Sequence, residues 1–379
     1  MTEELSQFIY LILYLLATSY FIVLGCIMLT RRENIISTHG ELMAKRRMTQ
    51  SVAIFMFTWA FDCMIYLFPM FYCNDITDKG YEICYLITLM LDAPLIYMVM
   101  HAVIQKKENT PYRTSALGLP FLCIVIWHII ASEDVCGKLP IHIASVLNVA
   151  IILFLIIRHA REYRIYVSRI KSEYSDISGR EIFWSWSCFA GFAVQAIIFI
   201  IYQYCWEPWL EIIYGVLSLA NAAYLCHCTY RQRPLDNDVV EEEPTEDIAA
   251  KEDTREKAFY SVIEQKLESL CEAKLLFLEP DLTRETLCLR LSISSTYLKM
   301  YFHSRGLSFY QYINTLRIEH AVKLMQENPD MQIREISELS GFRSQTTFRK
   351  MFKEVMGCLP SEIRKEPMQE TATEPQINS

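Results

Sequence analysis

The pattern of hydrophobic positions divides the chain into two parts of different character. Long apolar runs fill about the first 230 of the 379 residues, and shorter amphipathic patterns follow. A helix needs ~20 apolar residues to cross the ~30 Å hydrocarbon core of a bilayer. Seven runs approach that length, and we predict spans at residues 8–29, 52–72, 81–104, 115–132, 139–157, 183–204 and 209–228. The first part is therefore expected to be a seven-transmembrane helical bundle.

Basic residues indicate the orientation of these spans. If the N-terminus lies outside, the inner connections hold sixteen Lys and Arg residues, and the outer connections hold only Lys79 and Lys138. Connections rich in Lys and Arg stay on the cytoplasmic side. An odd number of spans then leaves the C-terminal part in the cytoplasm, with the lipid bilayer as partner of the first part.

An acidic stretch joins the two parts. Residues 234–254 hold nine acidic residues and one basic residue, a net charge of −8 that equals the net charge of the whole chain. Such a stretch buries little and repels itself, which predicts a disordered linker. It acts either as a spacer repelled by anionic lipid or as a mimic of DNA that covers a basic face. The expected division is 1–233 membrane domain, 234–254 linker, 255–366 soluble domain and 367–379 disordered tail.

The soluble domain begins with a pattern of short helices. Apolar residues at helical spacing predict a lead helix over about 256–272. Thr283 is placed to cap a short helix, because its hydroxyl can accept from a free backbone N–H. A turn near Ser292 and a second short helix over 294–302 complete a helix-turn-helix unit.

The same pattern then occurs a second time. Ser308 and Gln311 form a capping box for a longer helix over about 308–326. After it come a short helix, a turn at Gly341, and a helix with Ser344 as its N-cap. We therefore predict an all-α soluble domain with two helix-turn-helix units joined by a linker helix.

The final helix of the second unit carries groups that suit DNA. Gln345, Thr346, Arg349 and Lys350 share one face of it, whereas Phe348 and Phe352 are expected to point inward. Gln reads adenine and Arg reads guanine in the major groove. We assign Gln345 and Arg349 to bases, and Lys350 and Lys353 at least partly to phosphates. The alternative is an ordinary solvated helix face.

Over about 85 residues, many positions carry the residue types of one protein family at that family's spacing. They are Ile336, Ser337, Gly341, Phe342, Ser344, Phe348, Arg349, Phe352, Lys353, Gly357, Pro360 and Arg364, together with Leu316, Arg317, Ile318, Ala321, Leu324 and Met325 in the linker helix. With these residues, the region from about 282 to 365 resembles the DNA-binding domain of the AraC/XylS family of bacterial transcription regulators. The resemblance implies sequence-specific binding of double-stranded DNA, and it allows a homodimer and, for an activator, a contact with RNA polymerase.

The first unit departs from that family pattern. Its equivalent face is Ser295, Thr296, Lys299 and Met300. Ser292 stands where the family usually has Gly, Met300 where it often has Arg, and His303 near a usual Lys. Fewer charged donors remain, so this unit either reads DNA by apolar contact or mostly positions the domain.

Polar residues recur at two depths of the predicted bundle. Those near the middle are Asp62, Asp92, Asn148, Gln195 and Asn221, and those nearer the outer face are His128, His142, Glu207 and Glu211. Ionisable groups in the bilayer interior are candidates for function. The middle group is a ligand or proton-sensing site, a transport path, or a set of hydrogen bonds between helices. The outer group is interfacial polarity or a site for a metal or another cation.

The connection after the fifth span has a pattern of its own. Residues 158–177 read as a basic amphipathic helix that continues the span, with a stripe of Tyr163, Tyr166, Ile170, Tyr174 and Ile177. Such a stripe pairs with a partner helix or with the DNA-binding domain. It is equally suited to lie on anionic lipid.

No pattern predicts catalysis, a cofactor or a metal centre. The thirteen cysteines lack zinc-site spacing, and four at outer ends either form one disulfide or stay as thiols: Cys73, Cys84, Cys136 and Cys205. A phosphate-binding loop, a kinase signature and a nucleophile elbow are all missing. We therefore expect a one-component transcription regulator in the bacterial cytoplasmic membrane, responding to an unknown signal ligand. The alternatives are a transporter or membrane enzyme whose occupancy the C-terminal domain reports, and a domain that docks proteins.

Overall fold

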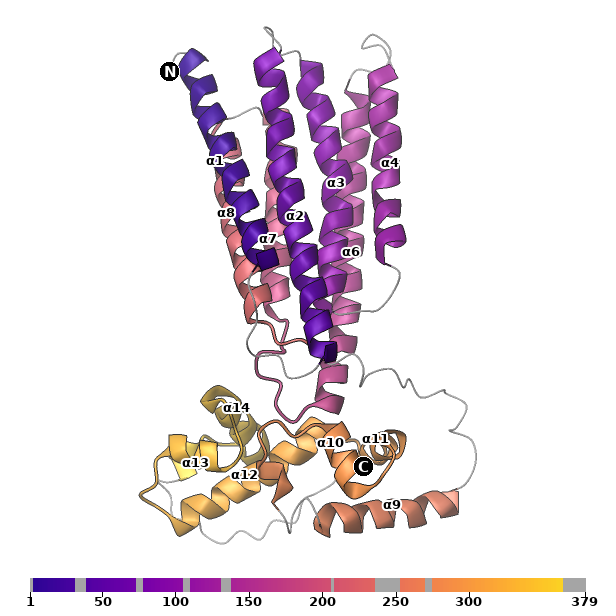
Figure 1. Ribbon diagram of the computed structural model, residues 1–379, viewed down its shortest axis with the longest axis vertical. Helices are drawn as coiled ribbons and strands as arrows, with labels where there is room; N and C mark the ends of the chain where they lie inside the picture. Colours follow the sequence, from indigo (N-terminus) through magenta and orange to yellow (C-terminus); the bar gives the residue numbers. More distant parts are fainter. Residues whose placement is uncertain are drawn as a thin grey trace. The chain divides into compact units, whose positions relative to one another are not determined.

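The fold is helical throughout the residues that the structure, a computed structural model, describes (Figure 1). These residues are 3–30, 39–72, 78–104, 110–130, 138–205, 208–235, 253–269 and 275–363. The all-α prediction is confirmed for them. Most of the predicted linker and the whole predicted tail lie outside the described residues.

The chain divides into two compact units. Residues 1–166 and 179–238 form the apolar unit, and residues 167–178 and 239–379 form the C-terminal unit. The short segment 167–178 therefore belongs to the second unit, although the first unit precedes and follows it in sequence. The boundary that we expected near residue 233 left residues 167–178 in the membrane domain.

The apolar unit is a bundle of long helices. They are α1 (Glu3–Thr30), α2 (His39–Tyr72), α3 (Asp78–Ile104), α4 (Thr110–Ile130), α6 (Leu139–Glu173), α7 (Trp184–Cys205) and α8 (Pro208–Arg231). Six of them are long and apolar enough to cross a membrane. The remaining helix, α4, offers a shorter apolar stretch at Ala116–Ile130.

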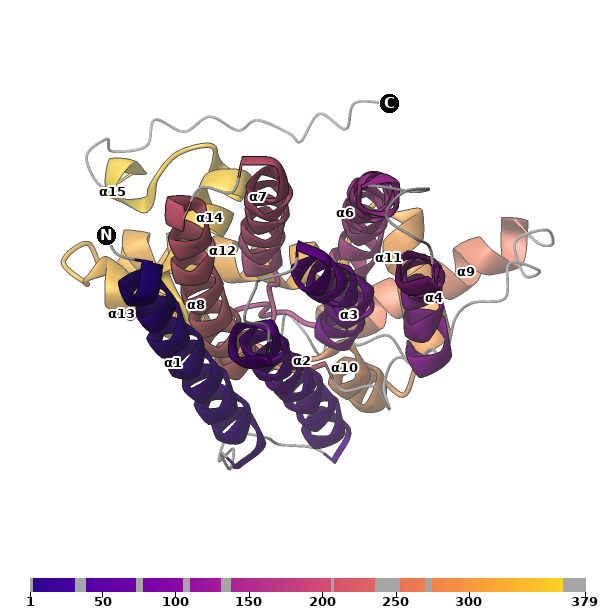
Figure 2. The same ribbon diagram turned by 90° about the horizontal axis from the view of Figure 1, so that it is seen from above.

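The outer faces of these helices are apolar. Leu16, Val146 and Ile157 are 62%, 71% and 71% exposed, and a surface of such side chains is suited to lipid. Inside the bundle, α1 packs on α2 and α8, α3 packs on α2 and α4, and α7 packs on α8 (Figure 2). Helices distant in sequence thus bring polar side chains together at the centre.

One end of the apolar unit is closed by a network of charged groups. The Lys45 ammonium of α2 donates to three backbone carbonyls at the end of α8, at 2.5–2.9 Å. The Arg180 guanidinium lies 3.2 Å from the carboxylate of Glu41 in α2. The backbone N–H of Arg233 donates to the Gly179 carbonyl at 2.7 Å. The chain that leaves α6 is therefore clamped by α2 and α8.

Helix α6 ends earlier than its pattern predicts. The structure ends it at Glu173, and Tyr174 instead forms an antiparallel bridge with Thr283, so the prediction of a helix to residue 177 was wrong. The apolar side chains Ile170, Tyr174 and Ile177 are nevertheless buried. Contacts inside the C-terminal unit, to which residues 167–178 belong, override the helical periodicity here.

The C-terminal unit consists mostly of short helices. They are α9 (Asp253–Leu267), the 3-10 turn η3 (Leu276–Leu278), α10 (Arg284–Leu291), α11 (Ser295–Ser304), α12 (Phe309–Glu327), α13 (Ile333–Leu339), α14 (Gln345–Met356) and α15 (Pro360–Ile363). A buried apolar cluster joins α9, α10, α11 and the start of α12. Helix α12 begins with both hydrogen bonds of the predicted capping box between Ser308 and Gln311. It contacts η3, α13 and α14, and its Phe309 and Ile313 share a buried cluster with Leu287 of α10 and Leu298 of α11.

Candidate nucleic-acid interface

Helix α14 is held on the unit by its aromatic side. The Phe348 and Phe352 side chains are fully buried, and the Phe348 ring lies 5.3 Å from that of Phe342. At its start, the Ser344 hydroxyl accepts from the backbone N–H of Thr347, which confirms the predicted N-cap. The orientation of α14 is therefore determined by buried apolar contacts and by its cap.

The opposite side of α14 is open to solvent. The candidate base-reading and phosphate-binding side chains are all exposed and make no hydrogen bond or ion pair with any described residue: Gln345, Thr346, Arg349, Lys350 and Lys353. Their amide, hydroxyl, guanidinium and ammonium groups can therefore donate to base edges and phosphate oxygens without breaking an existing bond.

The turn before α14 requires glycine. Gly341 has a φ of 81°, and a Cβ built there would lie 2.6 Å from the Leu278 carbonyl oxygen. Left-handed backbone and the close approach of η3 both exclude a side chain. This contact packs the second helix pair against the segment that precedes the first.

A buried arginine, Arg317 of α12, connects the η3 segment to the turn between α13 and α14. Its guanidinium is 1% exposed and donates to the carbonyls of Phe277 at 2.6 Å and Glu279 at 2.7 Å. It also lies 5.7 Å from the centre of the Phe342 ring. A planar guanidinium with five donors suits this position, whereas a lysine ammonium does not. The sequence marked Arg317 only as part of a family pattern.

The first helix pair, α10 and α11, is built differently. Thr283 caps α10 by accepting from the Thr286 N–H at 3.1 Å, as predicted. Ser292 takes the left-handed conformation, with φ 52°, at the turn. Helix α11 buries Leu298 and Phe302.

The candidate reading face of α11 is half-buried. Ser295, Thr296 and Lys299 are each intermediate in exposure, unlike the open face of α14. Beside them lies Arg284, the first residue of α10, which is 5% exposed and was missed by the sequence analysis. The sequence signal for Arg284 was that it directly follows Thr283, the predicted N-cap.

The polar residues predicted near mid-bilayer do not form one site. Asp62 lines a cavity of about 170 Å³, and it accepts from the Thr88 hydroxyl at 2.6 Å. Asp92, Asn148 and Gln195 line a second cavity of about 50 Å³. Asn221 lines neither, and its side chain lies against Gly191 of α7.

The predicted outer group also separates. Glu211 lines the larger cavity and accepts from the hydroxyls of Tyr14 at 2.6 Å and Tyr202 at 3.1 Å. His128 lies elsewhere, 3.1 Å from the Glu82 carboxylate. Glu207 lies outside the described residues. Within the described ranges, no three His, Cys, Asp or Glu side chains are arranged to hold a metal ion.

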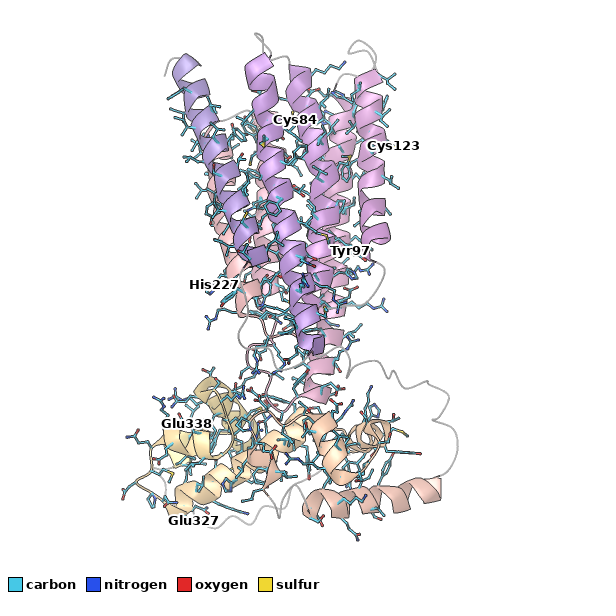
Figure 3. The ribbon with its side chains drawn as sticks, in the orientation of Figure 1. Cys84, Tyr97, Cys123, His227, Glu327 and Glu338 are labelled. Atoms are coloured by element: carbon cyan, nitrogen blue, oxygen red, sulfur yellow. The ribbon has the colours of Figure 1, made fainter. Side chains whose placement is uncertain are left out.

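Two of the four outer cysteines lie among the described residues. Cys84 is buried on α3 (Figure 3), and Cys205 at the end of α7 is exposed. Cys73 and Cys136 lie outside the described residues. One disulfide or unbonded thiols therefore both stay predictions for this group.

Comparisons with known proteins concern the C-terminal unit alone. A family described as a helix-turn-helix domain matches residues 287–366. The TCP pilus virulence regulatory protein of Vibrio cholerae serotype O1 is 31% identical over 116 residues, which cover 27% of this chain and 42% of that protein. The Msm operon regulatory protein of Streptococcus mutans serotype c is 40% identical over 78 residues, or 20% of this chain and 28% of that protein.

The chain thus spans less than half the length of these relatives. No solved structure matches the chain. The matched residues contain α11 to α14, including both candidate reading helices and the linker helix between them. Residues 287–366 are therefore a helix-turn-helix domain of the AraC/XylS type.

Proposed function

We propose that the chain is a membrane-tethered, one-component transcription regulator that binds specific DNA in response to a signal at or in the membrane. The observation that carries this proposal is the open face of α14. Gln345 and Arg349 stand on it without partners among the described residues, above two fully buried phenylalanines. A rigid helix with free bidentate groups is what major-groove reading requires.

The membrane arrangement follows from helix length and charge. Six helices are long and apolar enough to span a bilayer, and α4 supplies a seventh, shorter span in the proposal. The distribution of Lys and Arg supports an orientation with the N-terminus outside and the DNA-binding domain in the cytoplasm of a bacterium. DNA of the nucleoid is then within reach of the domain.

The decisive experiment crosslinks the tagged full-length protein to chromosomal DNA in cells and sequences the recovered fragments. Wild type is compared with Arg349→Ala/Lys350→Ala. The matched control is Lys323→Ala/Arg334→Ala, which removes the same charge from exposed positions on α12 and α13, where Arg334 pairs with Glu338. Sharp peaks in wild type and in the control that vanish in the α14 variant are expected. Equal peaks in all three would show that α14 does not read DNA.

The larger cavity is the proposed sensing site. Five helices line it, α1, α2, α3, α7 and α8, and its wall combines tyrosines and Trp59 with the carboxylates of Asp62 and Glu211. No Lys, Arg or His is among the described residues that line it. Aromatic faces attract cations, and the oxygens of the Asp62 and Glu211 carboxyl groups add acceptors for a positive charge. The cavity therefore fits a small organic cation with an apolar body.

A probe of this chemistry tests the cavity. Benzyltrimethylammonium should raise the unfolding temperature of the purified full-length protein, because a ligand that binds only the folded state stabilises it. Benzyl alcohol, which has the ring without the charge, should not. Asp62→Asn should abolish the shift, and Asp92→Asn, in the other cavity, should retain it. An equal shift with benzyl alcohol would contradict a cation site. Uptake of the probe into sealed vesicles would favour a transporter.

A further inference from the structure

The segment between Glu173 and Ser178 lies on the DNA-binding unit, and its contacts are dense. Ser175 is fully buried; its backbone N–H and its hydroxyl both donate to the Leu282 carbonyl, at 3.2 Å and 2.7 Å. Its carbonyl accepts from the Asn314 side chain at 2.9 Å. Its hydroxyl oxygen also accepts from the Arg317 guanidinium at 3.1 Å. One residue of the connection after α6 thus bonds to the centre of the linker helix.

The two ends of this segment contact both candidate reading helices. At one end, the Ser178 hydroxyl lies 3.1 Å from the hydroxyl of Thr347, in the first turn of α14. At the other end, the Glu173 carboxylate interacts favourably with the charge of Lys299 in α11. The half-buried state of the α11 face is consistent with this cover.

Glu173 holds a cation whose hydrogen bonds are incomplete. Its carboxylate lies 2.6 Å from one terminal nitrogen of Arg284, and both side chains are under 10% exposed. The Nε and Nη1 groups of Arg284 have no hydrogen-bond partner among the described residues, and neither has the second oxygen of Glu173. A phosphate, with more acceptor oxygens, can satisfy more of the Arg284 donors than this single contact does.

From these contacts we infer that residues 173–178 compete with DNA for the reading surface of the same chain, with Glu173 in the place of a backbone phosphate. The inference rests on the proposed function and adds its regulation. DNA that engages Arg284, Lys299 and the start of α14 together has to displace the segment. When DNA displaces the segment, a backbone phosphate replaces the Glu173 carboxylate beside Arg284 and Lys299.

The chain also connects this segment to the sensing cavity. Directly after Ser178, Gly179 and Arg180 are clamped by Arg233 and by Glu41, at the ends of α8 and α2. Both of those helices line the larger cavity. A ligand that changes the spacing of α2 and α8 pulls on the segment and changes the balance between segment and DNA. A signal is therefore transmitted through covalent chain and needs no second messenger.

A reversible disulfide tests the competition in full-length protein in native membranes. In Ser178→Cys/Thr347→Cys, two hydroxyls 3.1 Å apart become thiols close enough to join on mild oxidation. The single variants serve as controls for the natural cysteines. Burial raises the pKa of the Cys288 thiol to about 11, so this neighbour stays protonated and slow to react.

The probe is a duplex carrying a fragment recovered by chromosomal crosslinking. We expect the oxidised double variant to bind it about tenfold or more weakly than the reduced form. The disulfide keeps the segment in place, and the segment then prevents charge-assisted contacts between the cations and DNA phosphates. Bound duplex should also slow disulfide formation. Failure of the disulfide to form, or equal binding by the oxidised and reduced forms, would overturn the inference. If the reduced form and wild type also failed to bind any DNA, the proposed function itself would fail.

A charge variant gives a second readout. Glu173→Gln should bind the duplex several-fold more tightly, because the anionic competitor is lost. Glu181→Gln is the matched control, since it makes the same charge change at an exposed position a few residues later. Should both variants bind as wild type does, the carboxylate of Glu173 would have no part in the competition.

Discussion

The two helix-turn-helix units of this protein have the same pattern but different construction. The second unit has a glycine in its turn, a side-chain cap on its reading helix and an open face with free Gln, Arg and Lys groups. The first unit has Ser292 in the left-handed turn and a reading helix whose N-cap Ser294 makes no side-chain bond. Its face is half-buried beside the Glu173–Ser178 segment. Under the proposed function, this difference assigns DNA reading to the second unit and regulation to the first.

The largest expected effect breaks the second unit at its turn. Gly341→Ala should destabilise the C-terminal unit by about 3 kcal/mol or more, because it adds backbone strain and a clash with the Leu278 carbonyl. Gly357→Ala is the matched control, since Gly357 has a similar φ of 76° but open space around it, and about 1 kcal/mol is expected. Denaturant unfolding of the full-length protein compares them. Equal losses would mean that η3 does not pack against this turn.

The next effect separates reading from positioning. Arg349→Ala should weaken binding to a specific fragment by about 1–3 kcal/mol and relax specificity at one base position. The measurement is a titration of full-length protein with fragments mutated one base pair at a time. A uniform loss across all of these fragments would instead assign Arg349 to a phosphate.

A change in the first unit should have a smaller effect of the opposite sign. Ser292→Gly should stabilise the C-terminal unit by about 1 kcal/mol, because glycine adopts the φ of 52° without strain. Ser304→Gly, at the helical end of α11, should destabilise by about 0.5–1 kcal/mol and provides the control. Both are followed by denaturant unfolding. If Ser292→Gly also destabilised the unit, the serine would have a role that its backbone does not reveal.

The smallest effect concerns Lys299. Its replacement by Ala should weaken DNA binding by less than Arg349→Ala does, equally for all sequences, and should reduce the salt dependence by about one phosphate contact. Titrations at several salt concentrations measure this slope. A loss of specificity at a base position would show that α11 reads sequence and would remove the contrast between the units.

Much of the helical fold could be predicted because its signals are local. Ser308 with Gln311, Thr283 and Ser344 each begin the helix that the spacing indicated, since a cap involves only residues three positions apart. The inward direction of Phe348 and Phe352 follows from helical periodicity alone. The membrane-length helices are likewise visible as runs of apolar residues.

The candidate sites were less predictable, because they depend on which helices become neighbours. Asp62 and Asp92 occupy matching depths on consecutive helices, yet they line different cavities. Glu211 was expected in an outer group, but it shares a cavity wall with Asp62. Arg284 was not singled out in the sequence and Arg317 was noted only as part of a family pattern, yet both are buried.

The sequence by itself determined most of the helices, their caps and the exposed side of α14, because these depend on short spacings and on residue type. Tertiary structure alone decided that α6 ends at Glu173 and that Ser175 bonds to Arg317 from 142 positions away. Tyr174 kept its helical spacing in the sequence but pairs with Thr283 as a bridge. Local propensity differs little between those two conformations, so the buried hydrogen bonds and the Glu173–Arg284 ion pair of the folded unit determined the outcome.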